Sequence, residues 1–100
     1  MKIVIVSGGF DPLHSGHINH FEAARGLGDK LIIALNSDDW LARKKGQPFM
    51  PFHERAAIIS KLQVVDDVWQ FNDDDESASA ALVRAKAAFP DATIIFGNGG

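Results

Sequence analysis

Two continuous apolar runs near the N-terminus predict two buried strands with a helix between them. Lys2–Val6 holds four β-branched residues in succession, and Leu31–Leu35 is apolar throughout. Strands buried on both faces of a parallel sheet have such runs, whereas half-exposed strands alternate apolar and polar residues. Residues 15–25 instead place apolar side chains three and four positions apart, which is a helical spacing. We therefore expect a strand, a helix and a second strand, with the first strand at the centre of the sheet.

The remainder of the chain continues this alternation. We expect a short helix over residues 39–43, a mobile basic loop over 43–50, a helix over 51–62, a strand around 68–71, a helix over 77–89 and a fourth buried strand over 93–96. Strands and helices that alternate at this spacing predict an α/β fold, a Rossmann-like, doubly wound parallel sheet with helices on both faces. Ligands of such sheets bind at the carboxyl ends of the strands. The stretches 7–17, 36–38 and 97–100 are therefore expected to meet there.

Three features along these elements carry specific expectations. At 100° per residue, Arg55 falls within the apolar stripe of its helix, where a guanidinium needs an anion, either a ligand or an internal carboxylate such as that of Asp38. The acidic run 73–76 is interpreted as solvated residues at the N-terminus of the next helix. Trp40 and Trp69 are interpreted as packing residues.

Composition excludes several classes of function. The formal net charge of −3 argues against a protein that binds nucleic acid irrespective of sequence, because such proteins need clustered basic surface. There is no cysteine, so neither a disulfide framework nor a thiolate zinc site can form. No apolar run approaches the roughly 20 residues of a membrane-spanning helix, and no secretory leader is recognisable. We expect one cytoplasmic α/β domain over residues 1–100 with small-molecule partners, and no membrane association.

The stretch Ser7–Asn19 concentrates the candidate chemistry. Gly8 and Gly9 let backbone N–H groups approach an anion where the chain leaves the first strand, and the following helix aims its free N–H groups at the same place. Neither the Gly-x-Gly-x-x-Gly nor the Gly-Lys-Ser/Thr phosphate fingerprint is present. His14 and His17, three residues apart at the helix entrance, can present two imidazoles to one ligand. The stretch is interpreted as a phosphate-binding loop that uses histidine.

The residues Gly-Phe-Asp-Pro-Leu-His-Ser-Gly-His at positions 9–17 resemble the HxGH signature of the nucleotidyltransferase superfamily. The turn at 27–29, the strand after it, Asp38 and the Lys44 to Arg55 spacing resemble the cytidylyltransferase branch, especially the glycerol-3-phosphate cytidylyltransferases, across nearly all 100 residues. The Gly-Gly-x-Asp-Pro sequence is also similar to that of adenylyltransferases acting on nicotinate mononucleotide and phosphopantetheine. The resemblance implies transfer of CMP from CTP, or alternatively of AMP from ATP, to a phosphorylated small-molecule acceptor with release of pyrophosphate.

The resemblance, together with position at the strand ends, also implies the site. The expected catalytic residues are His14, His17 and Lys44, and the expected substrate-binding residues are Asp38 and Lys45. The expected nucleotide-binding residues are Gly8, Gly9, Phe10, Asp11, Gly16, Arg55, Gly97 and Asn98. Mg²⁺ is expected to accompany the nucleotide triphosphate, and a homodimer is expected.

The sequence departs from the family pattern at several positions. Gly46 replaces a second basic residue of the lysine loop, Gln63 replaces an arginine of the glycerol-3-phosphate enzymes, and Gly97-Asn98-Gly99 replaces an acidic turn. Family members continue into a fifth strand and a helix start rich in serine and threonine that grips the triphosphate. We therefore expect either that the C-terminal part of the domain is missing from these 100 residues, or that the protein lacks part of its nucleotide site.

Two other functions compete with nucleotidyl transfer. Asp11, His14, His17 and His20 repeat every three residues, and carboxylate and imidazole both suit zinc. Pro12 and the glycines argue against a continuous helix that would align all four, so we expect no metal site. The other competitor is a module that binds a nucleotide without turnover.

Overall fold

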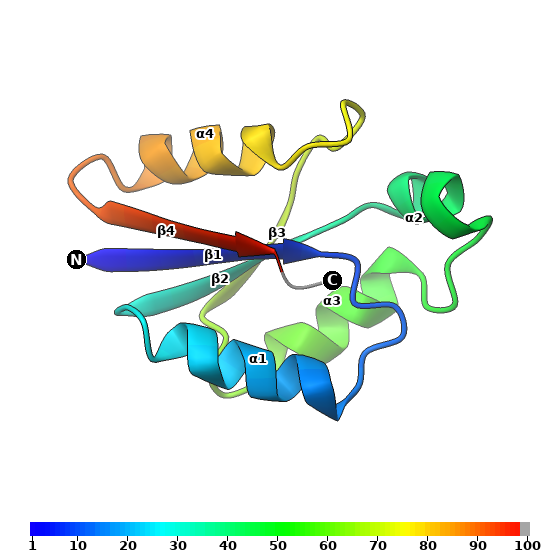
Figure 1. Ribbon diagram of the computed structural model, residues 1–100, viewed down its shortest axis with the longest axis horizontal. Coiled ribbons are helices and arrows are strands. Elements are labelled where there is room, and N and C mark those ends of the chain that lie inside the picture. The colour runs from blue at the N-terminus through cyan, green and yellow to red at the C-terminus, as the bar shows by residue number, and fades with distance from the viewer. Residues whose placement is uncertain (99–100) are drawn as a thin grey trace.

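Four parallel strands form the centre of the structure, and they lie in the order β3-β2-β1-β4 (Figure 1). The computed structural model describes residues 1–98, so the end of the predicted loop at 97–100 lies outside the described residues. The elements in chain order are β1 (Lys2–Gly8), α1 (Ser15–Arg25), β2 (Lys30–Leu35), α2 (Asp38–Lys45), α3 (Phe52–Ser60), β3 (Asp67–Gln70), α4 (Ser79–Ala88) and β4 (Thr93–Asn98). The expected central position of the first strand is confirmed.

The strands are buried because both faces of the sheet are covered. Ile5 in β1 pairs with Ile32 in β2 on one side and with Phe96 in β4 on the other. Helices α1 and α3 lie on one face and α4 on the other (Figure 1). Alternate residues of β1 point to opposite faces, so Val4 and Val6 join the core under α1 and α3, whereas Ile3 and Ile5 join the core under α4. The predicted α/β fold with helices on both faces is confirmed.

Helix α2 is longer than the sequence pattern predicts, since it begins at Asp38 and also includes Lys44 and Lys45. The prediction of a basic loop that begins at Arg43 was therefore wrong. The Ser37 side chain accepts the Trp40 N–H at the start of α2, and three basic residues occupy the last turn, where they favour the helix dipole. Gly46 ends the helix with a φ of 96°, a left-handed conformation that favours glycine.

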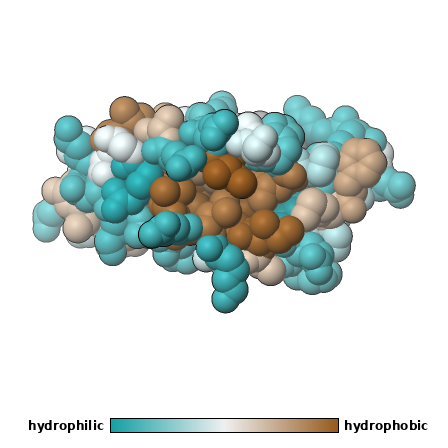
Figure 2. Space-filling model, turned by 90° about the horizontal axis from the view of Figure 1, so that it is seen from below, coloured by the Kyte–Doolittle hydropathy of each residue, from teal (hydrophilic) through white to brown (hydrophobic). Residues whose placement is uncertain are grey.

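Strand β4 is not fully buried, contrary to the prediction. Ile94 and Ile95 are only half-buried, and Phe96 is 37% exposed. β4 is an edge strand of the sheet, and an open groove with a volume of about 230 Å³ lies between α1 and β4. The groove is lined mainly by apolar side chains, from Val4, Val6, Ala23, Ala24, Leu27, Ile95 and Phe96. Figure 2, which views this face, shows apolar surface left uncovered there.

None of the helices within residues 1–98 is both long and apolar enough to cross a membrane.

Candidate active site

The loop after β1 ends in a histidine pair that builds the start of helix α1. His14 is the N-cap residue, and its Nδ1 accepts the Gly16 backbone N–H at 3.1 Å. Nδ1 of His17 in turn accepts the His14 backbone N–H at 3.2 Å. This reciprocal arrangement is a capping box in which two imidazoles take the places usually held by a hydroxyl and a carboxylate. The helix start therefore fixes the orientation of both rings.

The two imidazoles are stacked on each other at the start of α1. Their centroids are 3.9 Å apart with an interplanar angle of 20°. Because each Nδ1 accepts a backbone N–H, the proton of the neutral ring is carried by Nε2 in both residues. Burial, followed by the nearby His14 and His20, lowers the pKa of His17 below its ordinary value. The pair therefore offers two N–H donors at the positive end of α1, which suits a phosphate.

Phe10 packs against the His17 ring of this pair. Its side chain is fully buried and meets the His17 ring edge-on at 5.1 Å and the Phe21 ring at 4.9 Å. The backbone of Phe10 has a φ of 51°, which a bulky residue rarely adopts. A non-glycine residue held in this region by its surroundings is typical of functional sites.

Two glycines of the loop are required by close packing. A Cβ at Gly16 would lie 2.9 Å from Cε1 of His14, so a side chain there would displace the imidazole. A Cβ at Gly9 would lie 2.8 Å from Cδ2 of Leu41, which belongs to α2. The sequence analysis assigned both glycines to ligand access, whereas the structure shows them making room for neighbouring side chains.

Asp11 anchors the segment between α2 and α3. Its carboxylate accepts the backbone N–H groups of Phe49 at 2.7 Å and Met50 at 2.6 Å and pairs with the Lys45 ammonium at 2.9 Å. Burial by itself would raise the pKa of Asp11, but these hydrogen bonds outweigh burial and lower it. Lys45 also donates to the Asp11 carbonyl and lies over the Phe49 ring. The predicted ligand roles of Asp11 and Lys45 stay predictions, because both residues are bound to each other here.

Arg55 meets an internal partner, as one of the two sequence-based interpretations expected. The guanidinium has no exposed surface and donates to Asp38 Oδ1 at 2.8 Å. It also donates to the carbonyls of Gly9, Asn36 and Met50 at 2.8–2.9 Å. Asp38 is 43% exposed. Arg55 thus joins the loop after β1, the end of β2 and the start of α3, and its predicted contact with nucleotide would require this network to open.

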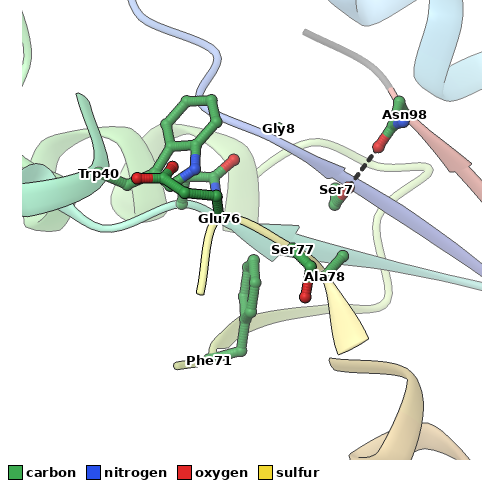
Figure 3. Close-up of a pocket in the computed structure, with 9 residues that line it drawn as sticks. Ser7, Gly8, Trp40, Phe71, Glu76, Ser77, Ala78 and Asn98 are labelled. Carbon is green, nitrogen blue, oxygen red and sulfur yellow. Dashed lines mark hydrogen bonds between the residues drawn. The ribbon is translucent and has the colours of Figure 1, made fainter. Parts of the chain in front are cut away.

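A cavity of about 270 Å³ opens beside the loop at the carboxyl ends of β1, β2 and β4. Figure 3 shows Trp40 and Glu76 on one side of it and Ser7 and Asn98 on the other, with Phe71 below. Ser7 Oγ donates to Asn98 Oδ1 at 2.9 Å. The lining residues are Ser7, Gly8, Asn36, Trp40, Phe71, Glu76, Ser77, Ala78 and Asn98. We call this cavity the crevice pocket.

Only part of the crevice pocket was predicted from the sequence. Gly8 and Asn98 were expected as site residues, and Ser7 and Asn36 belong to the stretches expected at this end of the sheet. Gly97 instead lines the apolar groove on the opposite face of the sheet. Trp40 lines the pocket instead of packing in the core, while Trp69 is 4% exposed and packs under α4 as expected. The strand-end rule could have indicated Phe71, which follows β3 directly. Nothing in the sequence pattern indicates that Glu76 and Ser77 reach this pocket.

Asp73 is the clearest correction at the site, because the sequence analysis placed it in a solvated run. It is 2% exposed and accepts hydrogen bonds from Asn36 and Ser37. Burial would raise the pKa of Asp73, but these hydrogen bonds outweigh burial and lower it. The prediction was wrong for Asp73, although Asp74, Asp75 and Glu76 are exposed as expected.

Lys44 lies exposed in the last turn of α2, with its Nζ 5.3 Å from the centroid of the Trp40 ring.

The zinc alternative is weakened, because Asp11 is engaged by Lys45 and both imidazoles use Nδ1 for backbone N–H groups. Within residues 1–98, no group of three or more histidine and acidic side chains is arranged to hold a metal ion.

A family model and several known proteins match this chain in sequence. A family model described as cytidylyltransferase-like matches residues 5–96. The bifunctional protein HldE of Hahella chejuensis is 43% identical over 75 residues, which are 73% of this chain and 16% of that protein. The HldE of Methylococcus capsulatus is 40% identical over 85 residues, which are 83% of this chain and 18% of that protein. The chain therefore spans less than a fifth of the length of these relatives.

A solved structure matches over the whole chain. The crystal structure of the lipopolysaccharide core biosynthesis protein from Thermoplasma volcanium superposes with a TM-score of 0.73 at 24% sequence identity. The match covers 100% of this chain and 97% of that one. It shows that the two share the α/β fold described above.

Proposed function

Because the chain belongs to the cytidylyltransferase-like family, we propose that it transfers CMP from CTP to a phosphorylated small-molecule acceptor and releases pyrophosphate. The observation that carries this proposal is the histidine pair at the start of α1. Both Nε2–H groups are oriented by the capping box at the N-terminus of α1, the positive end of the helix dipole. ATP in place of CTP is the alternative donor.

The proposed reaction is a direct displacement at the α-phosphorus. An oxygen of the acceptor phosphate attacks this phosphorus, a new P–O bond forms, and the bond to the bridging oxygen of the β-phosphate breaks. The electron pair leaves with pyrophosphate. No covalent link to the protein is needed, so positioning and charge stabilisation supply the catalysis. The Nε2–H groups of His14 and His17 hold the α- and β-phosphate oxygens, on which charge develops.

Lys44 supplies positive charge from the other side of the crevice. It stands in the last turn of α2, next to Trp40. An ammonium on a flexible stem can follow the phosphates as pyrophosphate departs. Lys45 adds a second positive charge, provided that its contact with Asp11 opens when the nucleotide binds.

Mg²⁺ fits this site as a companion of the nucleotide. Two carboxylates of the loops at this end of the sheet are already engaged, Asp11 with Lys45 and Asp38 with Arg55. Mg²⁺ commonly binds through substrate phosphates and waters with few protein ligands, and when bound it neutralises phosphate charge. No protein cage is therefore required.

The crevice pocket is the proposed acceptor site. It adjoins the phosphate loop through Gly8, and its lining combines the aromatic side chains of Trp40 and Phe71 with the polar side chains of Ser7 and Asn98. A small molecule with polar substituents can be held there by hydrogen bonds while its phosphate reaches toward the histidines. Asp38 stands at the start of α2, on the same side.

We further propose a cytoplasmic location, where nucleoside triphosphates are supplied, and a homodimer. The homodimer rests on the family resemblance alone. Sedimentation equilibrium of the purified chain tests it, and a mass equal to that of one chain at all concentrations would contradict it.

The experiment that tests the function is a titration of CTP and of ATP together with a pyrophosphate-release assay over several phosphorylated acceptors. We expect binding of one nucleotide and release that depends on one acceptor. Nucleotide binding without release under any acceptor would identify a binding module instead. Stoichiometric zinc in the purified protein, with no affinity for either nucleotide, would favour a metal site.

A further inference from the structure

Asp73 is a buried residue whose carboxylate accepts hydrogen bonds from the two residues that precede helix α2. Its Oδ2 accepts the Ser37 backbone N–H at 2.8 Å and Asn36 Nδ2 at 3.1 Å, and its Oδ1 accepts the Ser37 hydroxyl at 2.8 Å. The neighbouring Asp74 is exposed. A carboxylate that is removed from water and bonded three times holds its partners far more firmly than a solvated one.

These bonds determine the start of helix α2. Ser37 Oγ also accepts the Trp40 backbone N–H at 3.0 Å, which is the N-cap bond of α2. A hydroxyl can donate only one hydrogen bond, and the Ser37 hydroxyl donates it to Asp73. A lone pair of the same oxygen is therefore left to accept the Trp40 N–H. Asp73 therefore orients the cap as well as holding the loop that precedes it.

A second attachment holds the other end of α2 to the same turn. Arg43 Nη2 donates to the Asp73 carbonyl at 3.1 Å, and Arg43 Nε donates to Glu76 Oε1 at 2.9 Å. The turn at 73–76 is thus joined to both ends of the helix that carries Trp40 and Lys44. The Arg43–Glu76 pair is exposed on both sides, so it contributes less than the Asp73 carboxylate.

We propose that Asp73 is the positioning residue of α2 and that, through Ser37, it sets the Trp40 wall of the crevice pocket and thereby the affinity for the acceptor. This inference rests on the proposed function for its reference to the acceptor. Asp73 does not line the pocket, so it acts through α2 and not by touching the substrate.

The substitution Asp73→Asn removes this control while keeping the volume of the side chain. The new amide must turn its NH₂ group either toward the Ser37 N–H, which is itself a donor, or toward the Ser37 hydroxyl, whose proton then loses its acceptor. Either orientation loses part of the network. Asp74→Asn is the matched control, because it removes the same charge from an exposed position in the same turn.

The test has three readouts. Hydrogen exchange of residues 38–45 should be about tenfold faster in Asp73→Asn than in the wild type or Asp74→Asn, the factor expected for the loss of roughly one hydrogen bond. Exchange in α1 should be unchanged. In a Trp69→Phe background, Trp40 fluorescence should shift to longer wavelength. The KM for the acceptor should rise about tenfold, with the KM for the nucleotide unchanged.

Each outcome bears on the proposal. Unchanged exchange in α2, or an equal rise in both KM values, would overturn it. If wild type transfers no nucleotidyl group to any acceptor, the proposed function fails, whereas faster α2 exchange with the Trp40 shift would still support the positioning of the wall. If Asp73→Asn does not fold, Ser37→Ala replaces it and should change α2 in the same direction. If Asp73 acts through Ser37, the double variant Asp73→Asn with Ser37→Ala should raise the acceptor KM no more than Asp73→Asn alone.

Discussion

The imidazoles of His14 and His17 lie face to face, 3.9 Å apart, and each is held by a backbone N–H that donates to its Nδ1. The same hydrogen bonds therefore build the helix start and aim the two catalytic candidates. A change in either ring therefore acts on structure and chemistry together. The stability of each variant and its turnover must consequently be measured separately.

We expect His17→Ala to lower turnover about 10²-fold or more, the usual effect of removing one donor from a developing oxyanion. Pyrophosphate release measures this, with circular dichroism confirming the fold. His53→Ala, an exposed histidine on α3, is the control and should leave turnover unchanged. Near-normal release by a folded His17→Ala protein would refute the role.

The stability of the protein should fall as the pH drops below about 6.5. Burial lowers the pKa of His17 in the folded state, so the unfolded chain binds more protons than the folded one between the two pKa values. The stability contributed by neutral His17 is complete above the unfolded pKa and is lost as the pH falls through the folded one. Protonation also removes the lone pair that accepts the His14 N–H. Urea unfolding at pH 5.5 and 7.5 should show this, and the loss should be smaller in His17→Gln. Equal losses in both proteins would contradict the assignment.

Arg55→Met should destabilise the fold by about 2–4 kcal/mol. The buried carbonyls of Gly9 and Asn36 and the partly buried carbonyl of Met50 lose their donor, and each unsatisfied buried group costs roughly 1–3 kcal/mol before relaxation. Asp38→Asn should cost less, because the amide oxygen of asparagine can still accept the Arg55 hydrogen bond and the position is 43% exposed. Thermal unfolding compares the two. A larger loss from the Asp38 variant would show that the ion pair and not the carbonyl network holds these loops.

Asp11→Ala should release the segment between α2 and α3. The substitution removes the acceptor for the N–H groups of Phe49 and Met50 and the partner of Lys45. Trypsin cleaves after lysine, so cleavage after Lys44 and Lys45 should accelerate about tenfold. Asp91→Asn, an exposed position far along the chain, is the control. Unchanged cleavage would mean that this segment is held by other contacts.

The hydrophobic pattern predicted the fold well because burial on both faces leaves a direct trace in the sequence. Lys2–Val6 and Leu31–Leu35 were recognised as strands, and the inward position of Arg55 followed from helical geometry alone. The fourth strand was misjudged for a physical reason. Its apolar residues have the composition of a buried strand, but whether they are covered depends on what lies beside β4, which local pattern does not encode.

The site was predicted less completely than the fold. The histidines and glycines of the loop stand together in the sequence, so their spacing reveals them. Asp73 lies between β3 and α4 and meets Ser37, the N-cap of the helix that carries Trp40, only in the folded chain. A carboxylate in an acidic run looks solvated until its donors are known. The hydrogen-bond partners of Asp73 lie 36 and 37 positions away, so the sequence around Asp73 carries no signal of its role.

The close approach of Gly9 to Leu41 has a consequence for redesign of this protein. The phosphate loop and helix α2 touch where a side chain is absent, and a single methyl group there would collide with Leu41 at 2.8 Å. The loop proposed to bind the nucleotide and the helix that walls the proposed acceptor pocket are therefore in contact at Leu41. A redesign of the acceptor pocket that shifts α2 at Leu41 would disturb this loop, so a change meant for the acceptor alone has to leave the Gly9–Leu41 contact in place.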